Sequence, residues 1–166
     1  MKNWDIDKKI AASIVLALIG ISYVAGVGKI FISVGPNSSD VKARYSAELK
    51  QSENTEDIDS FLEEPVGPIS LEKLVHITHA HLMPYTFLFA ISAFFIVSLS
   101  WSVGAKTVFL SLFAISILGD FAAMFLTRFL SSEFHVLIML SGAIFGLCLA
   151  TVIFSSFYEL WIKSRK

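Results

Sequence analysis

The chain has little charge and few of the groups that soluble enzymes use. Only 16% of its 166 residues are charged, against about 25% in ordinary soluble domains, and the net charge is −1. The single cysteine, Cys148, excludes an intramolecular disulfide framework and a cysteine-based zinc finger. There is no basic patch for nucleic acid, no Cys-x-x-Cys-His for covalent haem, no glycine-rich phosphate loop and no nucleophile motif. These absences argue against a stand-alone soluble enzyme.

Apolar sequence, in contrast, is abundant. Hydrophobic residues make up 55% of the chain, with 15 phenylalanines and a mean hydropathy of +0.70. A bilayer core needs about 20 apolar residues per helix, and four runs reach that length. The sequence therefore predicts an all-α polytopic membrane protein, with residues 1–166 forming one four-helix bundle and spans at 10–31, 71–101, 107–127 and 134–160. The first run is longer than a signal-peptide core, so we expect a retained helix.

Basic and aromatic residues predict how the bundle lies in the membrane. Positive charge collects on the cytoplasmic side of membrane proteins, and tryptophans mark the interfaces. Both signals fall at the same ends of the four spans. They predict a bacterial inner-membrane protein with both termini cytoplasmic and the loop over residues 34–70 periplasmic. The residues concerned are Lys2, Lys8, Lys9, Lys106, Lys163, Arg165, Lys166, Trp4, Trp101 and Trp161.

The loop over residues 34–70 is the one sizeable polar segment. Gly35-Pro36-Asn37 predicts a turn at its start, and Asp40 to about Gln51 a short surface helix. Ser70 is a good N-cap for a helix that begins at Leu71. Between residues 40 and 64 the loop has eight acidic and three basic residues. A cationic redox protein on that side is one partner that this charge would attract.

All four histidines fall near one boundary of the predicted spans. His76, His79 and His81 open the second span, and His135 opens the fourth. On a regular helix His76 and His79 share a face, whereas His81 points almost opposite to His79. Pro84 disfavours regular helix just after the cluster, so we expect a kink there. Imidazole is a common ligand of iron, copper and zinc, and the cluster predicts a metal or haem site.

Two cofactors remain open from this pattern. Non-covalent haem b needs axial ligands from facing helices, and His135 with either His79 or His81 would supply them. Lys73 and Arg128 stand where haem propionates would lie. A bare copper or zinc ion would instead use His76, His79, His81 and His135 together. A third reading is a cofactor-free accessory subunit. We expect an electron carrier or cofactor-binding subunit rather than a stand-alone enzyme.

Asp120 is the one carboxylate deep within a predicted span. Such a residue costs about 2.5–3.5 kcal/mol on insertion scales, and its default interpretation is functional. We expect it to support a ligand or relay protons from a bound quinol, with Tyr85, Met83 and Met139 as further neighbours of the cofactor. Gly142 and Gly146 form a Gly-x-x-x-Gly pair, which is typical of close helix packing. A homo-oligomer is compatible with this pattern.

The segment Thr78-His79-Ala80-His81-Leu82 resembles a loosely defined group of small bacterial four-helix membrane proteins with a Thr-His-x-His motif. The resemblance covers mainly spans two to four. It implies the same topology and importance for the shared positions, and some members look like b-type cytochromes, which implies haem and electron transfer. The further shared positions are Gly119-Asp120, Arg128, Ser141-Gly142 and Leu160-Trp161.

Overall fold

The computed structural model describes residues 4–33, 35, 37–45 and 70–163. Four helices within these ranges are long and apolar enough to cross a membrane, which confirms the predicted all-α four-helix architecture. The last of them comprises a 3₁₀ turn, an α-helix and a π-helical turn in succession. The elements are α1 (Ile6–Ser33), α2 (Ser38–Tyr45), α3 (Leu71–Ser98), α4 (Val103–Phe129), η2 (Ser132–Phe134), α5 (His135–Phe157) and η3 (Tyr158–Ile162).

Serine caps decide where α3 and α4 begin. The Ser70 hydroxyl accepts a hydrogen bond from the Lys73 backbone N–H at 3.1 Å, which confirms the predicted start of α3. The Ser102 hydroxyl likewise accepts from the Ala105 N–H at 3.3 Å. As a result α4 begins four residues earlier than the predicted span, and α3 ends three residues earlier. The connection between the two helices is only the turn at residues 99–102.

Pro84 lies inside α3, and the helix continues through it from Leu71 to Ser98. The helix is therefore not interrupted beside the histidines, and the expected kink stays a prediction. Helices of membrane length tolerate an internal proline because one missing hydrogen bond is offset by packing against neighbouring helices. The histidines of α3 consequently keep regular helical spacing.

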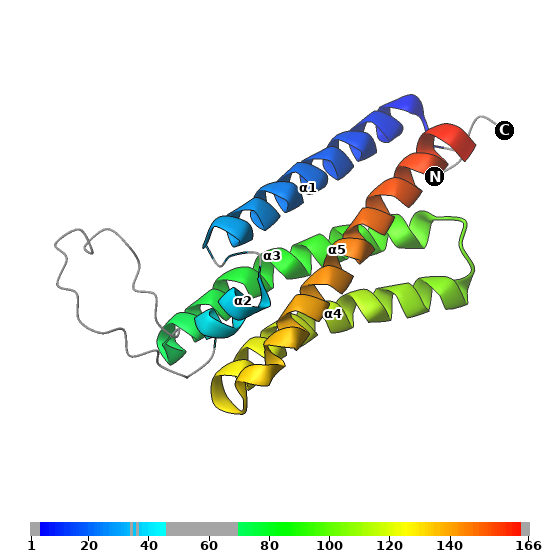
Figure 1. Cartoon of the computed structure of the whole chain (residues 1–166). Coiled ribbons are helices and arrows are strands. Elements are labelled where there is room, and N and C mark those ends of the chain that lie inside the picture. The colour runs from blue at the N-terminus through cyan, green and yellow to red at the C-terminus, as the bar shows by residue number, and fades with distance from the viewer. Residues whose placement is uncertain (1–3, 34, 36, 46–69, 164–166) are drawn as a thin grey trace, which may run out of the picture.

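The helices form a bundle with two dissimilar ends (Figure 1). At one end, here named the α2 end, the short helix α2 packs beside η2 and the start of α5. Gly35 precedes α2 in the left-handed conformation, with φ of +98°, as the predicted turn requires. The short helix predicted from Asp40 begins at Ser38, and its expected continuation over residues 46–51 lies outside the described residues.

The opposite end, here named the carboxy-terminal end, brings together Trp4, the turn at residues 99–102 and η3. The Trp161 indole N–H donates to the Ser13 hydroxyl at 3.0 Å, so η3 is fastened to α1. The Trp4 ring lies 6.1 Å from the Phe94 ring of α3. The tryptophans expected at one interface therefore do lie at one end of the bundle.

Aromatic side chains fill the centre of the bundle. Phe113 of α4 is fully buried and has three ring neighbours, at 5.4 Å from Phe145, 5.6 Å from Phe89 and 6.4 Å from Phe109. Edge-on and tilted contacts of this kind add to the energy of burial. This core holds α3, α4 and α5 together and sets the relative depth of their side chains.

Candidate functional site

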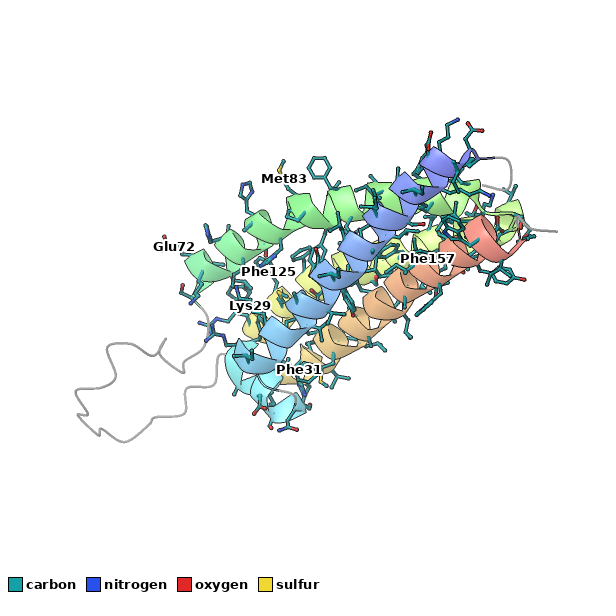
Figure 2. All side chains as sticks on the ribbon, turned by 90° about the horizontal axis from the view of Figure 1, so that it is seen from above. Lys29, Phe31, Glu72, Met83, Phe125 and Phe157 are labelled. Carbon is teal, nitrogen blue, oxygen red and sulfur yellow. The ribbon has the colours of Figure 1, made fainter. Side chains whose placement is uncertain are left out.

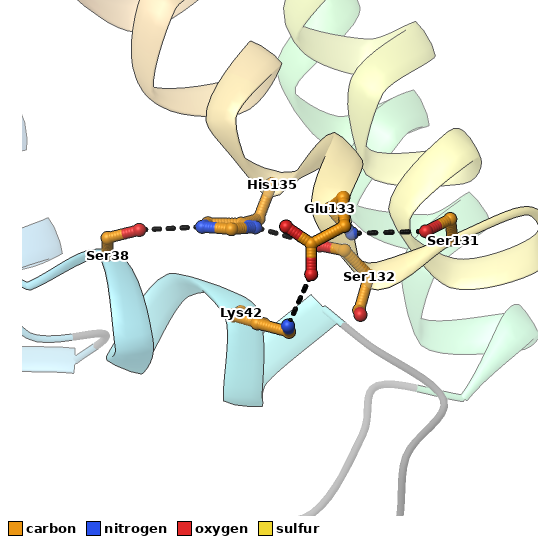
Figure 3. A network of polar contacts seen from close by, with 6 residues as sticks. All are labelled: Ser38, Lys42, Ser131, Ser132, Glu133 and His135. Carbon is orange, nitrogen blue, oxygen red and sulfur yellow. Dashed lines mark hydrogen bonds and ion pairs between the residues drawn. The ribbon is translucent and has the colours of Figure 1, made fainter.

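His135 is the most completely held of the four histidines (Figure 3). Its side chain is buried at the start of α5, with 6% of its surface exposed. Ring atom Nδ1 lies 2.8 Å from the Ser132 carbonyl oxygen, and Nε2 lies 2.6 Å from the Ser38 hydroxyl of α2. Beside it, Lys42 of α2 pairs with Glu133 at 2.7 Å. Ser38 and Lys42 thus hold α2 against the start of α5, where it covers the His135 ring.

The partners of His135 determine which nitrogen carries a proton. A carbonyl oxygen only accepts hydrogen bonds, so Nδ1 bears the hydrogen and donates to Ser132. In the neutral ring Nε2 then has a lone pair, which accepts the Ser38 hydroxyl. Histidines that bind metals are commonly oriented in this way, with one N–H fixed on a backbone carbonyl and the other nitrogen presented.

His81 lies on the face of α3 that points into the bundle. Residues of this face recur every three or four positions, and most are buried or half-buried: Leu74, Thr78, Tyr85, Leu88, Ser92, Phe95 and Leu99. His81 fits the same spacing between Thr78 and Tyr85, but unlike these residues its side chain is exposed. Its ring lies 6.2 Å from the Tyr85 ring, one turn further along the helix. An inward-facing imidazole with an open side is available to a ligand.

The other two histidines lie elsewhere on α3. His76 and His79 are exposed and fall outside the inward-facing positions. The described residues include all four histidines, and within them no group of three or more His, Cys, Asp or Glu side chains is placed to hold a metal ion. The structure therefore does not bring His76, His79, His81 and His135 to one point.

The two remaining candidates differ in depth. Tyr85 of α3 contacts Phe145 of α5 at 5.1 Å, which gives the register of these parallel helices. His81 precedes Tyr85 by four residues, whereas His135 precedes Phe145 by ten. At 1.5 Å per residue, His135 lies about 9 Å nearer the α2 end than His81. A group that bridged the two would be inclined to the bundle axis.

Asp120 lies among hydroxyl groups that come from several helices. Tyr85 interacts electrostatically with Asp120 of α4, Tyr23 of α1 and Tyr45 of α2, so the four side chains are neighbours. The Tyr85 ring also packs against Phe145, as above. Asp120 is half-buried and makes no hydrogen bond within the described residues. We name Tyr23, Tyr45, Tyr85 and Asp120 the tyrosine–aspartate cluster.

Tyr45 covers this cluster from the last turn of α2. Burial raises the pKa of its phenol, the charge of Asp120 raises the pKa further, and Arg44 opposes the change. The hydroxyl therefore stays protonated and keeps its ability to donate a hydrogen bond. Together with His135, Tyr45 makes α2 a cover over the polar part of the bundle.

The other predicted site residues have more ordinary places. Met83 points away from the bundle, with 60% of its surface exposed, and Met139 is also exposed (Figure 2). Neither methionine belongs to the tyrosine–aspartate cluster. Arg128 is half-buried in the last turn of α4 and Lys73 is exposed in the first turn of α3, so both lie toward the α2 end as expected. The contact of Arg128 and Lys73 with haem propionates stays a prediction.

Several residues of the site carry no signal in the sequence. Ser38 and His135 are 97 positions apart, and Lys42 and Glu133 are 91 apart. Tyr23 and Tyr45 lie on two further elements and look like ordinary interfacial or packing residues. No local spacing relates such positions, because only the folding of α2 onto α4 and α5 brings them together.

The length of the helices and their apolar outer surfaces define the class of protein to which this chain belongs. The four long helices expose apolar side chains such as Ile21 and Val24 of α1, which suits contact with lipid tails. The protein is therefore a small polytopic membrane protein.

The chain belongs to the Aq_1264_TM family, a family of transmembrane helical domains, whose model matches residues 37–166. No curated protein and no solved structure matches the chain.

Proposed function

We propose that this protein binds haem b non-covalently inside the bilayer, towards the α2 end, and carries electrons. The observation that carries the proposal is the orientation of His135. Its Nδ1–H is fixed on the Ser132 carbonyl, and its Nε2 lone pair points out from the start of α5. That arrangement suits an axial ligand of a haem iron. Ligation of a haem by Nε2 would take the place of the hydrogen bond from Ser38.

The second ligand is His81 rather than His79. Both were candidates from the sequence, but His81 alone lies on the inward-facing positions of α3, next to Tyr85. His79 projects from another face of the same helix. A haem between α3 and α5 would be held by His81 and His135.

The tyrosine–aspartate cluster gives this site a proton acceptor. Haem would supply one-electron chemistry when bound, and a quinol that donated its two electrons one at a time would also release two protons, one of which Asp120 would accept. Asp120 has no hydrogen bond within the described residues, so its carboxylate is available for a proton. Tyr85 lies between Asp120 and His81 in this proposal, since its ring is 6.2 Å from the His81 ring and it interacts electrostatically with Asp120. In this proposal quinol is the electron donor, and a redox protein outside the bundle is the acceptor.

The proposed orientation places the α2 end at the periplasmic face of a bacterial inner membrane. Lys106 and Lys163 lie at the carboxy-terminal end together with the three tryptophans, which supports a cytoplasmic location for that end. Electron transfer then takes place with partners on the periplasmic side.

Absorption spectra of the purified protein test the proposal. Protein made with ample haem supply and purified in mild detergent should show a reduced α band of b type after dithionite. His135→Ala and His81→Ala should each lose most of the bound haem, because each removes an axial ligand. The pyridine haemochrome assay gives the haem content per chain.

His79→Ala and Ser38→Ala are the matched controls. His79 is two residues from His81 on another face, and Ser38 contacts Nε2 without being a ligand, so both variants should retain haem. Equal loss from His79→Ala and His81→Ala would overturn the assignment of His81. A colourless wild-type protein after haem supplementation would overturn the proposed cofactor.

A further inference from the structure

A pocket of about 320 Å³ lies at the carboxy-terminal end, far from the proposed haem site. It opens between the turn at residues 99–102 and the last turns of α5. Its polar lining residues are Lys163, Glu159, Ser100 and Ser155, and its aromatic ones are Trp101, Phe154 and Tyr158. A pocket that combines a cation and hydroxyls with aromatic rings is suited to a ligand with an anionic head and an apolar tail.

The wall of this pocket is a π-helical turn. The chain leaves α-helical geometry at Tyr158 and continues as η3 to Ile162, directly before Lys163. Here the wider turn includes Tyr158 and Glu159, two of the residues that line the pocket.

Glu159 does not make the pocket acidic. Its carboxylate accepts hydrogen bonds from the Ser100 backbone N–H at 2.8 Å and the Ser100 hydroxyl at 2.5 Å, and it is 7% exposed. Lys163 lies 3.7 Å from it and also donates to the Ser100 hydroxyl. The negative charge of Glu159 is thus balanced by two hydrogen-bond donors of Ser100 and by the Lys163 ammonium.

Lys163 retains capacity for a ligand. Its ammonium has three N–H donors, and its side chain is 46% exposed. Two donors are directed at Ser100 and Glu159, which leaves one for an anion. The sequence adds two more cations, Arg165 and Lys166, within the next three positions. Clusters of basic residues beside a span attract anionic lipid headgroups.

The depth of the pocket favours a lipid over a soluble anion. Trp101 and Tyr158 are residue types that settle at the level of lipid headgroups. Phe154 lies one turn deeper along α5 and is 74% exposed, so it faces the region of the acyl chains. A ligand that used both ends of the pocket would have its phosphate at Lys163 and its chain along Phe154.

We propose that this pocket binds the phosphate headgroup of an anionic phospholipid, with Lys163 as its main contact and Ser155 as a further donor. The site is independent of the haem proposal, because it lies at the opposite end and shares no residue with it.

Thermal unfolding of the full-length protein in mild detergent tests this site with three added probes: phosphatidylglycerol, phosphatidylcholine and inorganic phosphate. Phosphatidylglycerol at about 100 times its dissociation constant should raise the Tm of the wild type by about 8 °C. The other two probes should leave the Tm unchanged. Lys163→Gln should lose the shift, and Lys106→Gln, which changes a cation at the same end but outside the pocket, should retain it.

The shift within each variant is the readout, so a change in basal stability does not affect the comparison. An equal shift with phosphatidylcholine would overturn the charge selectivity, and an equal shift with inorganic phosphate would overturn the lipid as the ligand. No shift in the wild type, or a full shift in Lys163→Gln, would overturn the site itself.

Discussion

The two ends of the bundle each contain a carboxylate close to apolar surroundings, and the two are treated in opposite ways. Glu159, at the carboxy-terminal end, accepts two hydrogen bonds from Ser100 and lies near Lys163. Asp120, in the half nearer the α2 end, makes no hydrogen bond within the described residues and has tyrosines as electrostatic neighbours. A satisfied carboxylate stabilises the fold, whereas an unsatisfied one within a membrane span costs stability.

The histidines follow the same division. The described parts of the carboxy-terminal end contain no histidine, and all four histidines are in the other half of the molecule. There, His135 is held by bonds from two different elements, while His81 is inward-facing but open. The histidines therefore gather towards the α2 end, whereas the contacts of Glu159 and Trp161 fasten helices at the other end.

Removal of the Glu159 carboxylate should have the largest effect. Glu159→Ala leaves the Ser100 N–H without its acceptor and Lys163 without its counter-ion. We expect the free energy of unfolding to fall by about 3 kcal/mol. Thermal unfolding in detergent measures this as a fall in Tm of roughly 6–10 °C.

Glu133→Ala is the matched control, because Glu133 also pairs with a lysine, Lys42, but its side chain is 74% exposed. Exposed pairs contribute about 0–1 kcal/mol, so its Tm should change little. Equal effects of the two variants would contradict the distinction between the two ends.

Gly146→Ala should have an intermediate effect on the packing of α1. A Cβ at position 146 would overlap the Tyr23 hydroxyl, so the α1 side chain must move. Overpacking of this kind costs about 1–3 kcal/mol. Thermal unfolding measures the loss, and Gly142→Ala is the control, since a Cβ there meets no atom within 4 Å. If both substitutions destabilise alike, the Gly-x-x-x-Gly pair acts as one packing motif, contrary to this structure.

Asp120→Asn should change stability in the opposite direction to Glu159→Ala. The substitution removes a charge that has no hydrogen-bond donor within the described residues, so we expect a gain of about 1 kcal/mol at neutral pH. A rise in Tm together with slower quinol-dependent reduction of bound haem would support a functional role. A clear fall in Tm would instead show that Asp120 has a stabilising partner.

Tyr45→Phe should have the smallest effect, visible only at alkaline pH. The pKa of Tyr45 is raised in the folded protein, so the unfolded chain loses the phenolic proton first as the pH increases. Its contribution to stability is complete below a pH of about 10 and is lost as the pH rises through the folded pKa.

Tm values at a pH of about 8 and about 11 should therefore differ less in Tyr45→Phe than in the wild type. An identical decrease in both proteins would show that Tyr45 is not buried under α2.

The sequence determined the architecture because membrane burial imposes a length and composition that can be counted. Four apolar runs predicted four helices, and Ser70 predicted the start of α3, since an N-cap depends only on neighbouring residues. Helix ends were placed less well. The start of α4 at Val103 depends on the N-cap Ser102. A count of apolar residues does not detect such a cap, so the predicted span began too late.

The site depended on tertiary structure. The sequence singled out the histidines and Asp120 by their residue types, and helical spacing separated His79 from His81, but only the packing of α3 shows that the face with His81 is the one turned into the bundle. The docking of α2 gave His135 its Ser38 partner and brought Tyr45 to Asp120. These contacts join residues up to 97 positions apart, so they follow from how the helices pack and not from any local pattern. Local rules fix the helices, and only their packing decides which polar side chains meet inside the bundle.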